Sequence, residues 1–217
     1  SYGDAFSRVI YTESHDEVAN GSARVPQEVN DDDPTGYYAQ KRSTLGAALV
    51  LTSPGLPMIF QGQEFLEGEW FRDTVPLHWD QGAQFKGIFR MYRDLIGLRR
   101  NEEGHTKGLT GQNVETLHLH PGNHVYVFHR WADGGPHDDV VVALNLDSKT
   151  WGDYTVGMPA AGRWVTRFNS DAKVYSDAFD GVDVPEWFDA VEDGYDGHPA
   201  SATIVLPPYS AVIVSRV

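Results

Sequence analysis

The chain has 217 residues, of which 41% are hydrophobic and 12% aromatic, a size and composition that suit one large or two small folded domains. Its 17 Lys and Arg against 31 Asp and Glu give a net charge of −14, which repels phosphate groups and argues against nucleic acid or an anionic membrane as a partner. It contains no cysteine, which excludes disulfides and thiol chemistry. The first four residues lack the pattern of a signal peptide and no apolar run reaches the length of a membrane span, so we expect a cytoplasmic protein.

The first hundred residues alternate strand and helix. Short apolar runs predict buried strands at Arg8 to Thr12 and at Leu56 to Phe60, and their continuous hydrophobicity is typical of a parallel sheet. Apolar residues at helical spacing predict helices over Tyr37 to Thr52 and from Gln84 to about Asn101. The arginines of the second helix, including Arg99, are expected on its solvent side. This order of elements predicts parallel α/β units.

After residue 103 the helical spacing weakens and short alternating runs take over. Gly, Pro, Asn and Asp separate these runs, which is typical of an antiparallel β-sandwich. The acidic, Gly-rich stretch from Asp177 to Pro199 is predicted to be a long loop. The expected strands are Val114 to Leu119, Val125 to Arg130, Val140 to Leu146, Trp164 to Phe168, Ala202 to Leu206 and Ala211 to Val214. The tryptophans of this half, Trp131, Trp151, Trp164 and Trp187, are expected to fill its core.

Polar side chains follow both strands of the first half. Glu13-Ser14-His15-Asp16 ends the first strand, and Gln61-Gly62-Gln63-Glu64 ends the second. Because the carboxyl ends of parallel strands meet at one edge of a sheet, we expect these groups to form two halves of one site. The alternatives are a surface or capping role for the His15–Asp16 pair and a structural ion pair for Glu64.

The residues around these two strand ends resemble the alpha-amylase family of glycoside hydrolases, and within it the glycogen-branching-enzyme group. Glu13 to Val18, followed by Arg24-Val25-Pro26, is similar to the motif at the seventh strand of that family, and Pro54 to Phe65 is similar to the eighth. The resemblance implies an α/β plus all-β fold. Residues 1–103 would be the last two βα units of a (β/α)8 barrel, and residues 104–217 would be an antiparallel β-sandwich domain that follows it.

The resemblance also implies roles for individual residues on an α-1,4-glucan such as glycogen, starch or a maltooligosaccharide. His15 would donate hydrogen bonds to sugar hydroxyls, and Asp16 would stabilise the oxocarbenium-like transition state. Glu64 would support the sugar site from the next strand. Aromatic platforms for the sugar are expected at Trp70, Trp79 and Tyr37, although Trp70 and Trp79 also suit simple packing of their loop.

Two catalytic carboxylates of the family have no counterpart in this sequence. Family members carry a nucleophilic Asp on the fourth strand and an acid/base Glu on the fifth, so the chain is expected to be part of a larger enzyme and inactive in isolation. A pair formed by Asp16 and Glu64 is a less favoured substitute. A branching enzyme, a hydrolytic amylase or debranching enzyme, and a non-catalytic carbohydrate-binding module all remain open. No cofactor is expected, and no metal either, because residues such as His105, His118, His120 and His129 lack ligand spacing.

Two βα units without the remaining barrel strands would expose strand edges and apolar faces. Exposed edges pair with other chains, so self-association through residues 1–100 is expected, unless this part is kept folded by packing on the sandwich.

Overall fold

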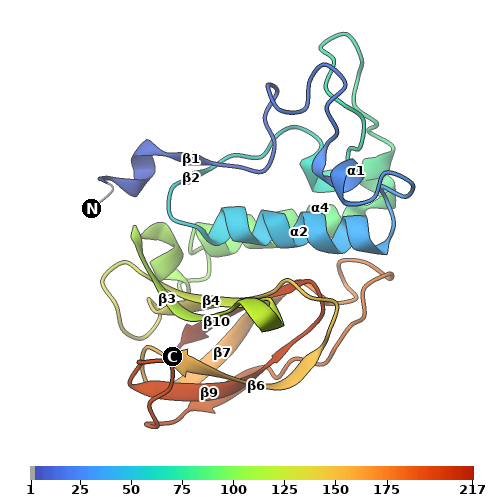
Figure 1. The fold of residues 1–217 in the computed structure, drawn as a ribbon. Helices are drawn as coiled ribbons and strands as arrows, with labels where there is room; N and C mark the ends of the chain where they lie inside the picture. The colour runs from blue at the N-terminus through green and yellow to red at the C-terminus, as the bar shows by residue number, and fades with distance from the viewer. Residues whose placement is uncertain (1–2) are drawn as a thin grey trace.

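The computed structural model describes residues 3–217, so the part of the signal-peptide prediction that concerns Ser1 and Tyr2 lies outside the described residues. The helices lie between a two-stranded parallel sheet above them and a six-stranded sheet below them, and a second two-stranded sheet lies beneath the six-stranded one (Figure 1). The first half contains η1 (Ala5–Ser7), β1 (Val9–Ile10), α1 (Val25–Val29), α2 (Tyr37–Thr52), β2 (Leu56–Pro57), η2 (Gln63–Phe65), α3 (Gln81–Gln84), α4 (Lys86–Arg99) and η3 (Lys107–Thr110). The second half contains β3 (Asn113–His120), η4 (Pro121–Asn123), β4 (Val125–Trp131), β5 (Val140–Asn145), β6 (Trp151–Met158), β7 (Gly162–Asn169), β8 (Trp187–Ala190), β9 (Ala200–Leu206) and β10 (Ser210–Arg216).

The six-stranded sheet is antiparallel, with the strand order β3-β4-β5-β10-β7-β8, and β6 pairs with β9 in the second sheet. The side chains of β5 and β10 alternate between two buried faces. Val142 and Ile213 belong to the core against the helices, whereas Val141 and Val212 belong to the core against β6 and β9. The prediction of an all-β antiparallel domain is therefore confirmed.

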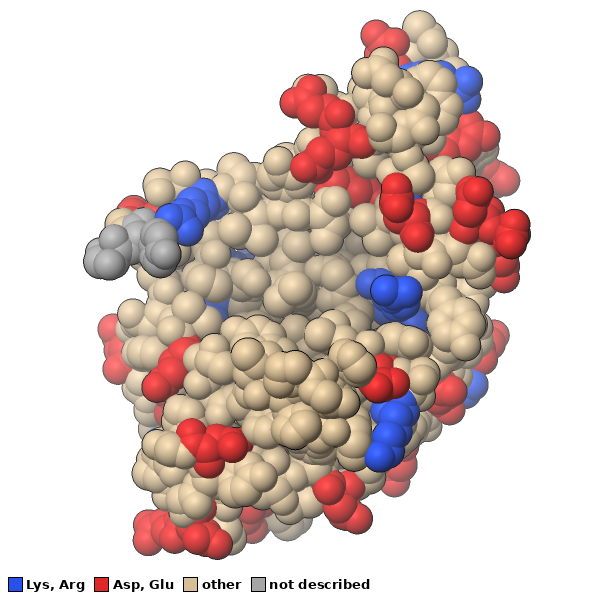
Figure 2. Space-filling view, viewed as in Figure 1, with Lys and Arg blue, Asp and Glu red and all other residues tan. Residues whose placement is uncertain are grey.

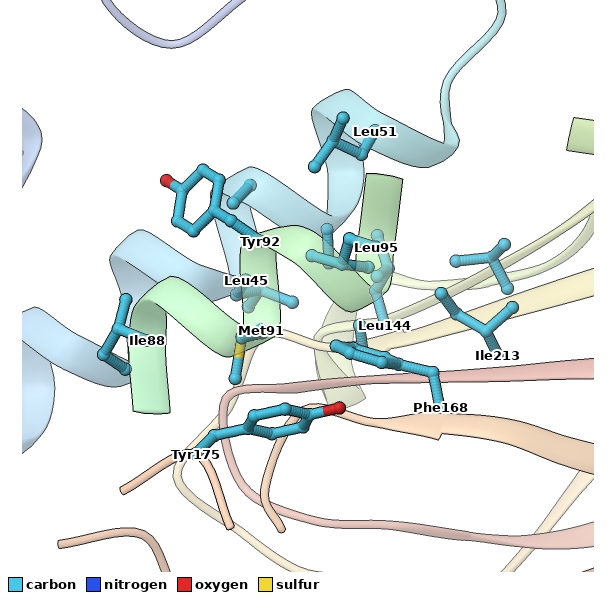
Figure 3. Packing of buried hydrophobic residues seen from close by; sticks show 14 of the residues in the cluster. Leu45, Leu51, Ile88, Met91, Tyr92, Leu95, Leu144, Phe168, Tyr175 and Ile213 are labelled. Carbon is cyan, nitrogen blue, oxygen red and sulfur yellow. The ribbon is translucent and has the colours of Figure 1, made fainter. Parts of the chain in front are cut away.

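The upper core joins the helices to the sheet (Figure 3). Leu45 and Leu51 of α2 and Met91 and Leu95 of α4 meet side chains of the six-stranded sheet, including Phe168. All five are buried. The helical layer therefore packs on the sheet through a continuous hydrophobic contact, which was one of the two alternatives expected from the sequence.

The predicted parallel pair is present but shorter and more exposed than expected. β1 and β2 pair in parallel, with Val9 opposite Leu56 and Ile10 opposite Pro57. Val9 is 52% and Leu56 49% exposed, so the prediction of fully buried strands is wrong. The physical reason is that this sheet contains only two strands in the described chain, so nothing covers its outer side.

Three further expectations are corrected by the structure. The stretch predicted as a loop from residue 177 contains β8, which pairs with β7. Trp187 lies on this edge strand and is 49% exposed instead of filling the core, whereas Trp164 is fully buried. Strand β6 was not predicted, because its polar and Gly-containing beginning hides the alternation.

Among residues 3–217, no helix is long and apolar enough to cross a membrane.

A buried ion pair links the helical layer to the sheet domain. Lys41 of α2 places Nζ 2.5 Å from Oδ1 of Asp171, and both side chains are almost completely buried. Asp171 also accepts hydrogen bonds from the backbone N–H groups of Asp180 and Val182. Burial lowers the pKa of Lys41, although Asp171 opposes this shift. The pair therefore ties α2 to the loop that follows β7.

Two buried arginines bind the carbonyl groups at the end of α2. Arg130 of β4 donates to the carbonyl of Thr52, the last residue of the helix, and burial lowers the pKa of Arg130 to about 9. Arg99 of α4 donates to the carbonyls of Ser53 and Gly55. Arg99 is therefore buried rather than on the solvent side as predicted. Cations at a helix C-terminus satisfy its free carbonyls and complement the helix dipole.

We expect Gly87→Ala to destabilise the protein by about 1–3 kcal/mol, because overpacking forces neighbouring backbone apart. A Cβ at Gly87 would lie 2.1 Å from the carbonyl oxygen of Tyr175, so α4 and the loop after β7 would have to separate. Gly82→Ala is the matched control, since a Cβ there meets nothing within 4 Å. Urea unfolding followed by circular dichroism should show a lower unfolding midpoint only for Gly87→Ala. Equal midpoints for both variants would contradict the close approach of α4 to the loop.

Candidate functional site

The loop after β1 is organised by a buried ion pair. Arg24 places Nη1 3.2 Å from Oε2 of Glu13, and both side chains are at most 2% exposed. Glu13 also accepts a hydrogen bond from the backbone N–H of Val25 at the start of α1. Burial raises the pKa of Glu13, although this N–H and the Arg24 guanidinium oppose the shift. The pair closes residues 13–25 into a fixed loop that carries His15 and Asp16.

The same arginine joins this loop to the chain after β2. Arg24 donates through Nη1 to the carbonyl of Gln61 and through Nε to the carbonyl of Glu69. Gln63 donates through Nε2 to Oγ1 of Thr12 at 2.7 Å. The polar segments after the two parallel strands are therefore physically connected, which is the arrangement expected from their positions in the sequence.

His15 and Asp16 lie at the surface of this region. Nε2 of His15 is 3.2 Å from Oδ1 of Asp16, and the two side chains are 68% and 85% exposed. Among the described residues, neither side chain makes an ion pair or hydrogen bond with a carboxylate of the second strand end. Figure 2 shows acidic side chains gathered on the loops above α2, with few basic ones beside them. The pair is thus accessible to a polar ligand from solvent.

Glu64 lies in η2 beside an apolar cavity of about 500 Å³. The cavity wall is formed by Ile59, Gln61, Glu64, Phe89, Tyr92, Arg93 and Ile96. Oε2 of Glu64 is buried and has no hydrogen-bond partner among the described residues. A buried carboxylate oxygen without a partner is costly, so this position suits a group that receives a hydrogen bond from a further molecule or segment.

The three predicted sugar platforms lie in different surroundings. Trp79 is 68% exposed and touches Phe65, with 5.5 Å between ring centroids. Trp70 is partly exposed and is covered on one face by the guanidinium of Arg72 at 4.8 Å. Tyr37 instead begins α2, and its hydroxyl donates to Oδ2 of Asp180 at 2.6 Å. Tyr37 is thus engaged between the helical layer and the loop after β7.

Four residues hold this region together: Glu13, Arg24, Glu67 and His78. Glu13 was predicted to belong to the site and Arg24 to its motif, but the roles of Glu67 and His78 were not predicted. Glu67 is 3% exposed, and it accepts hydrogen bonds from the backbone N–H and from Nδ1 of His78, the latter at 3.0 Å. The hydrogen bonds from His78 and Glu69 outweigh burial and lower the pKa of Glu67, while Glu67 raises the pKa of His78. Glu13 and Arg24 offered a signal in the sequence through the motif after the first strand, whereas the pairing of Glu67 with His78 offered none.

We expect the Glu67–His78 pair to stabilise the protein most between about pH 4.5 and 6.5, the ordinary pKa values of Glu and His. The raised pKa of His78 stabilises the folded protein below pH 6.5. This stabilisation is lost as the pH rises through the pKa of His78 in the folded state. The lowered pKa of Glu67 stabilises the folded protein above pH 4.5. This stabilisation is lost as the pH falls through the pKa of Glu67 in the folded state. His78→Asn should flatten the pH profile of the thermal midpoint in this window. His120→Asn, at an exposed histidine that has no carboxylate partner among the described residues, is the control, and an unchanged profile in His78→Asn would contradict the coupling.

No group of three or more His, Asp or Glu side chains that could hold a metal ion is found among residues 3–217.

The six-stranded antiparallel sheet and its two-stranded companion define an all-β sandwich domain packed beneath helices. Residues 117–217 match the family model described as the alpha amylase C-terminal all-beta domain, so this part of the chain is similar to that domain. The resemblance to the alpha-amylase family predicted from the two strand-end motifs is thereby confirmed.

Curated relatives extend the similarity over nearly the whole chain. It is 33% identical to the 1,4-alpha-glucan branching enzyme GlgB of Burkholderia vietnamiensis, over 96% of this chain and 28% of that protein. It is 30% identical to the enzyme of the same name from Mycolicibacterium paratuberculosis, over 92% of this chain and 27% of that protein. The chain thus spans less than a third of the length of these relatives.

Solved structures show the same fold. A debranching enzyme of Nostoc punctiforme superposes with a TM-score of 0.60 and 18% identity, over 95% of this chain and 35% of that chain. The alpha-amylase from H. orenii also gives a TM-score of 0.60, with 19% identity over 96% of this chain and 40% of that chain.

Proposed function

We propose that the chain is the C-terminal portion of an α-glucan-active enzyme, most similar to a 1,4-alpha-glucan branching enzyme. Residues 1–103 would complete a (β/α)8 catalytic barrel and residues 104–217 would form the domain after it. The observation that carries the proposal is the parallel pairing of β1 with β2, whose following segments are joined by Arg24 and hold His15, Asp16 and Glu64. Catalytic groups of such barrels stand at the ends of parallel strands.

In this proposal His15 and Asp16 orient the sugar, and Asp16 stabilises positive charge that develops on it. His15 donates a hydrogen bond to a sugar hydroxyl, while Asp16 accepts hydrogen bonds from hydroxyls of the same sugar unit. Both side chains are largely exposed, so a ligand can reach their hydrogen-bonding groups. Glu64 supports the site, and Trp79 and Trp70 offer exposed ring surface to the apolar faces of glucose units. Tyr37 is the weakest platform, because its hydroxyl is held by Asp180.

The 217-residue chain by itself is proposed to bind glucan without cleaving it. Retaining glycosidases need a nucleophilic carboxylate and a protonated carboxyl about 5 Å apart. In the roles proposed above, His15 and Asp16 orient the sugar and stabilise charge. They therefore act neither as the nucleophile nor as the acid. No cofactor is part of the proposal, and the location is proposed to be cytoplasmic.

The test combines turnover with binding on the 217-residue chain. Incubation with amylose should leave iodine staining and reducing ends unchanged, while calorimetric titration with maltoheptaose should show weak binding that Asp16→Asn reduces at least tenfold. Asp153→Asn, at an exposed position of β6, is the matched control and should bind as the parent does. Turnover of amylose would overturn the proposed inactivity. Binding that Asp16→Asn leaves unchanged would favour a carbohydrate-binding module on the sheet domain instead.

We also propose that the chain self-associates through β1 and β2, whose Val9 and Leu56 side chains are about half exposed. Light scattering should then give a mass above 24.1 kDa that increases with concentration. A strict monomer whose first hundred residues resist protease would contradict this.

A further inference from the structure

Two histidines that are far apart in the sequence meet at the junction between the helices and the sheet. His105 lies in the segment between α4 and η3, and His137 lies in the loop between β4 and β5. Their Nδ1 atoms are 3.3 Å apart, and their ring centroids are 5.3 Å apart. His105 is partly exposed and His137 is exposed, so an ion from solvent can reach both nitrogens.

This spacing is the one that a tetrahedral metal ion requires of two imidazole ligands. Zinc binds imidazole nitrogen at about 2.0–2.1 Å, so two such nitrogens at the tetrahedral angle lie about 3.4 Å from each other. Two neutral Nδ1 lone pairs at this distance repel unless a proton or a cation lies between them. Imidazole is a preferred ligand of Zn²⁺, Ni²⁺ and Cu²⁺, and water fills the remaining positions when the protein offers only two ligands.

Both histidines are held in place by the backbone. The N–H of His137 donates to the carbonyl of Arg216, and the carbonyl of His137 accepts from the N–H of Lys107. The N–H of Gly108 donates to the carbonyl of Asp138, which fixes the segment of His105 against the loop of His137. His137 has a φ of 63°, in the left-handed region that histidine enters more readily than most residues other than glycine.

The charges around the pair also favour a cation. Lys107 is the nearest basic residue along the chain, and Oδ2 of Asp133 lies 2.5 Å from its Nζ and balances its charge. The chain as a whole carries a net charge of −14, which raises the local concentration of divalent cations.

We propose that His105 and His137 form a binding site for a divalent transition-metal ion of the Zn²⁺ type, and that the ion clips the segment after α4 to the β4–β5 loop. The site is separate from the strand-end residues of the proposed function and does not depend on that function. The proposal departs from the expectation, drawn from sequence spacing, that the chain holds no metal.

The experiment is calorimetric titration of the 217-residue chain with ZnCl₂, together with thermal unfolding in the presence of Zn²⁺ or EDTA. We expect one-to-one binding in the micromolar range and a higher thermal midpoint with Zn²⁺, because a ligand bound to the folded state stabilises it. His105→Gln and His137→Gln should each weaken binding at least tenfold and abolish the zinc-dependent shift. Circular dichroism checks that these exposed substitutions leave the fold intact.

The control is His124→Gln, at another exposed histidine in the left-handed conformation, which should bind zinc as the parent chain does. The absence of binding at 1 mM Zn²⁺ would overturn the proposal. Unchanged affinity in both His105→Gln and His137→Gln would overturn it as well, and would place the ion elsewhere.

Discussion

Replacing Lys41 with Met is expected to lower the free energy of unfolding by about 3–5 kcal/mol, because removing one member of a buried ion pair leaves the other charge uncompensated. Asp171 is completely buried and would keep only the N–H groups of Asp180 and Val182 as partners. The loss falls on the contact between α2 and the loop after β7. Urea unfolding followed by tryptophan fluorescence measures it.

The control for Lys41→Met is Lys107→Met. Lys107 makes an ion pair with Asp133 at the same 2.5 Å separation, but both side chains are at least half exposed. Exposed pairs contribute little, so this variant should unfold close to the parent. The double variant Lys41→Met/Asp171→Asn should regain part of the lost stability, since the unpaired charge is gone. A loss in Lys41→Met no larger than in Lys107→Met would show that burial of the pair carries no energetic weight.

Arg24→Met is expected to have an effect of similar size, about 3–5 kcal/mol, concentrated in the loops after β1 and β2. The substitution strips Glu13 of its ion-pair partner and leaves the carbonyls of Gln61 and Glu69 without their donor. It also removes the guanidinium that lies 5.0 Å from the Phe60 ring centroid. Limited proteolysis should therefore cut residues 13–36 and 61–79 earlier than in the parent chain, before the sheet domain is attacked.

The pH dependence of Arg24→Met follows from Glu13. Burial already raises the pKa of this carboxyl, and loss of the arginine raises it further. A carboxyl with a raised folded pKa binds a proton on folding, so the stability deficit should be small below pH 4.5 and should grow as the pH rises above that value. Glu13→Gln combined with Arg24→Met should remove this dependence. Arg100→Met, at a 70% exposed side chain, should change neither stability nor its pH profile.

Regular periodicity in the sequence predicted the two long helices, α2 and α4, and the central strands, whereas the short helices α1 and α3 were not predicted. Helix α2 was predicted over Tyr37 to Thr52 with the bounds that the structure shows, although its buried residues include the polar Gln40, Lys41 and Thr44. The sequence did not predict which side of α4 is buried at its C-terminal end. Arg99 was therefore predicted on the solvent side, although it is buried. Its aliphatic stem suits burial once its guanidinium finds carbonyl partners. Strand β8 was not predicted because it has only four residues and lies within an acidic, Gly-rich stretch.

The candidate site was predicted only in part. The adjacent residues His15 and Asp16 and the order of the two strand ends were readable along the chain. The groups that fix the loops were not, because Arg24 reaches carbonyls 37 and 45 residues away and Glu67 reaches a histidine 11 residues away. Such partners are chosen by tertiary packing. The roles of His15, Asp16 and Glu64 on a sugar stay predictions until the binding variants are measured.

The arginine bonds at the end of α2 have a consequence for the order in which the chain folds. The last turn of α2 obtains its hydrogen-bond donor from Arg130, 78 residues later in the chain, so this helix end is complete only after β4 has docked. Such distant contacts form late, since their loop-closure entropy must be overcome first. Native-state hydrogen exchange should therefore show the amides in the last turn of α2 exchanging together with those of β4, in a single opening event.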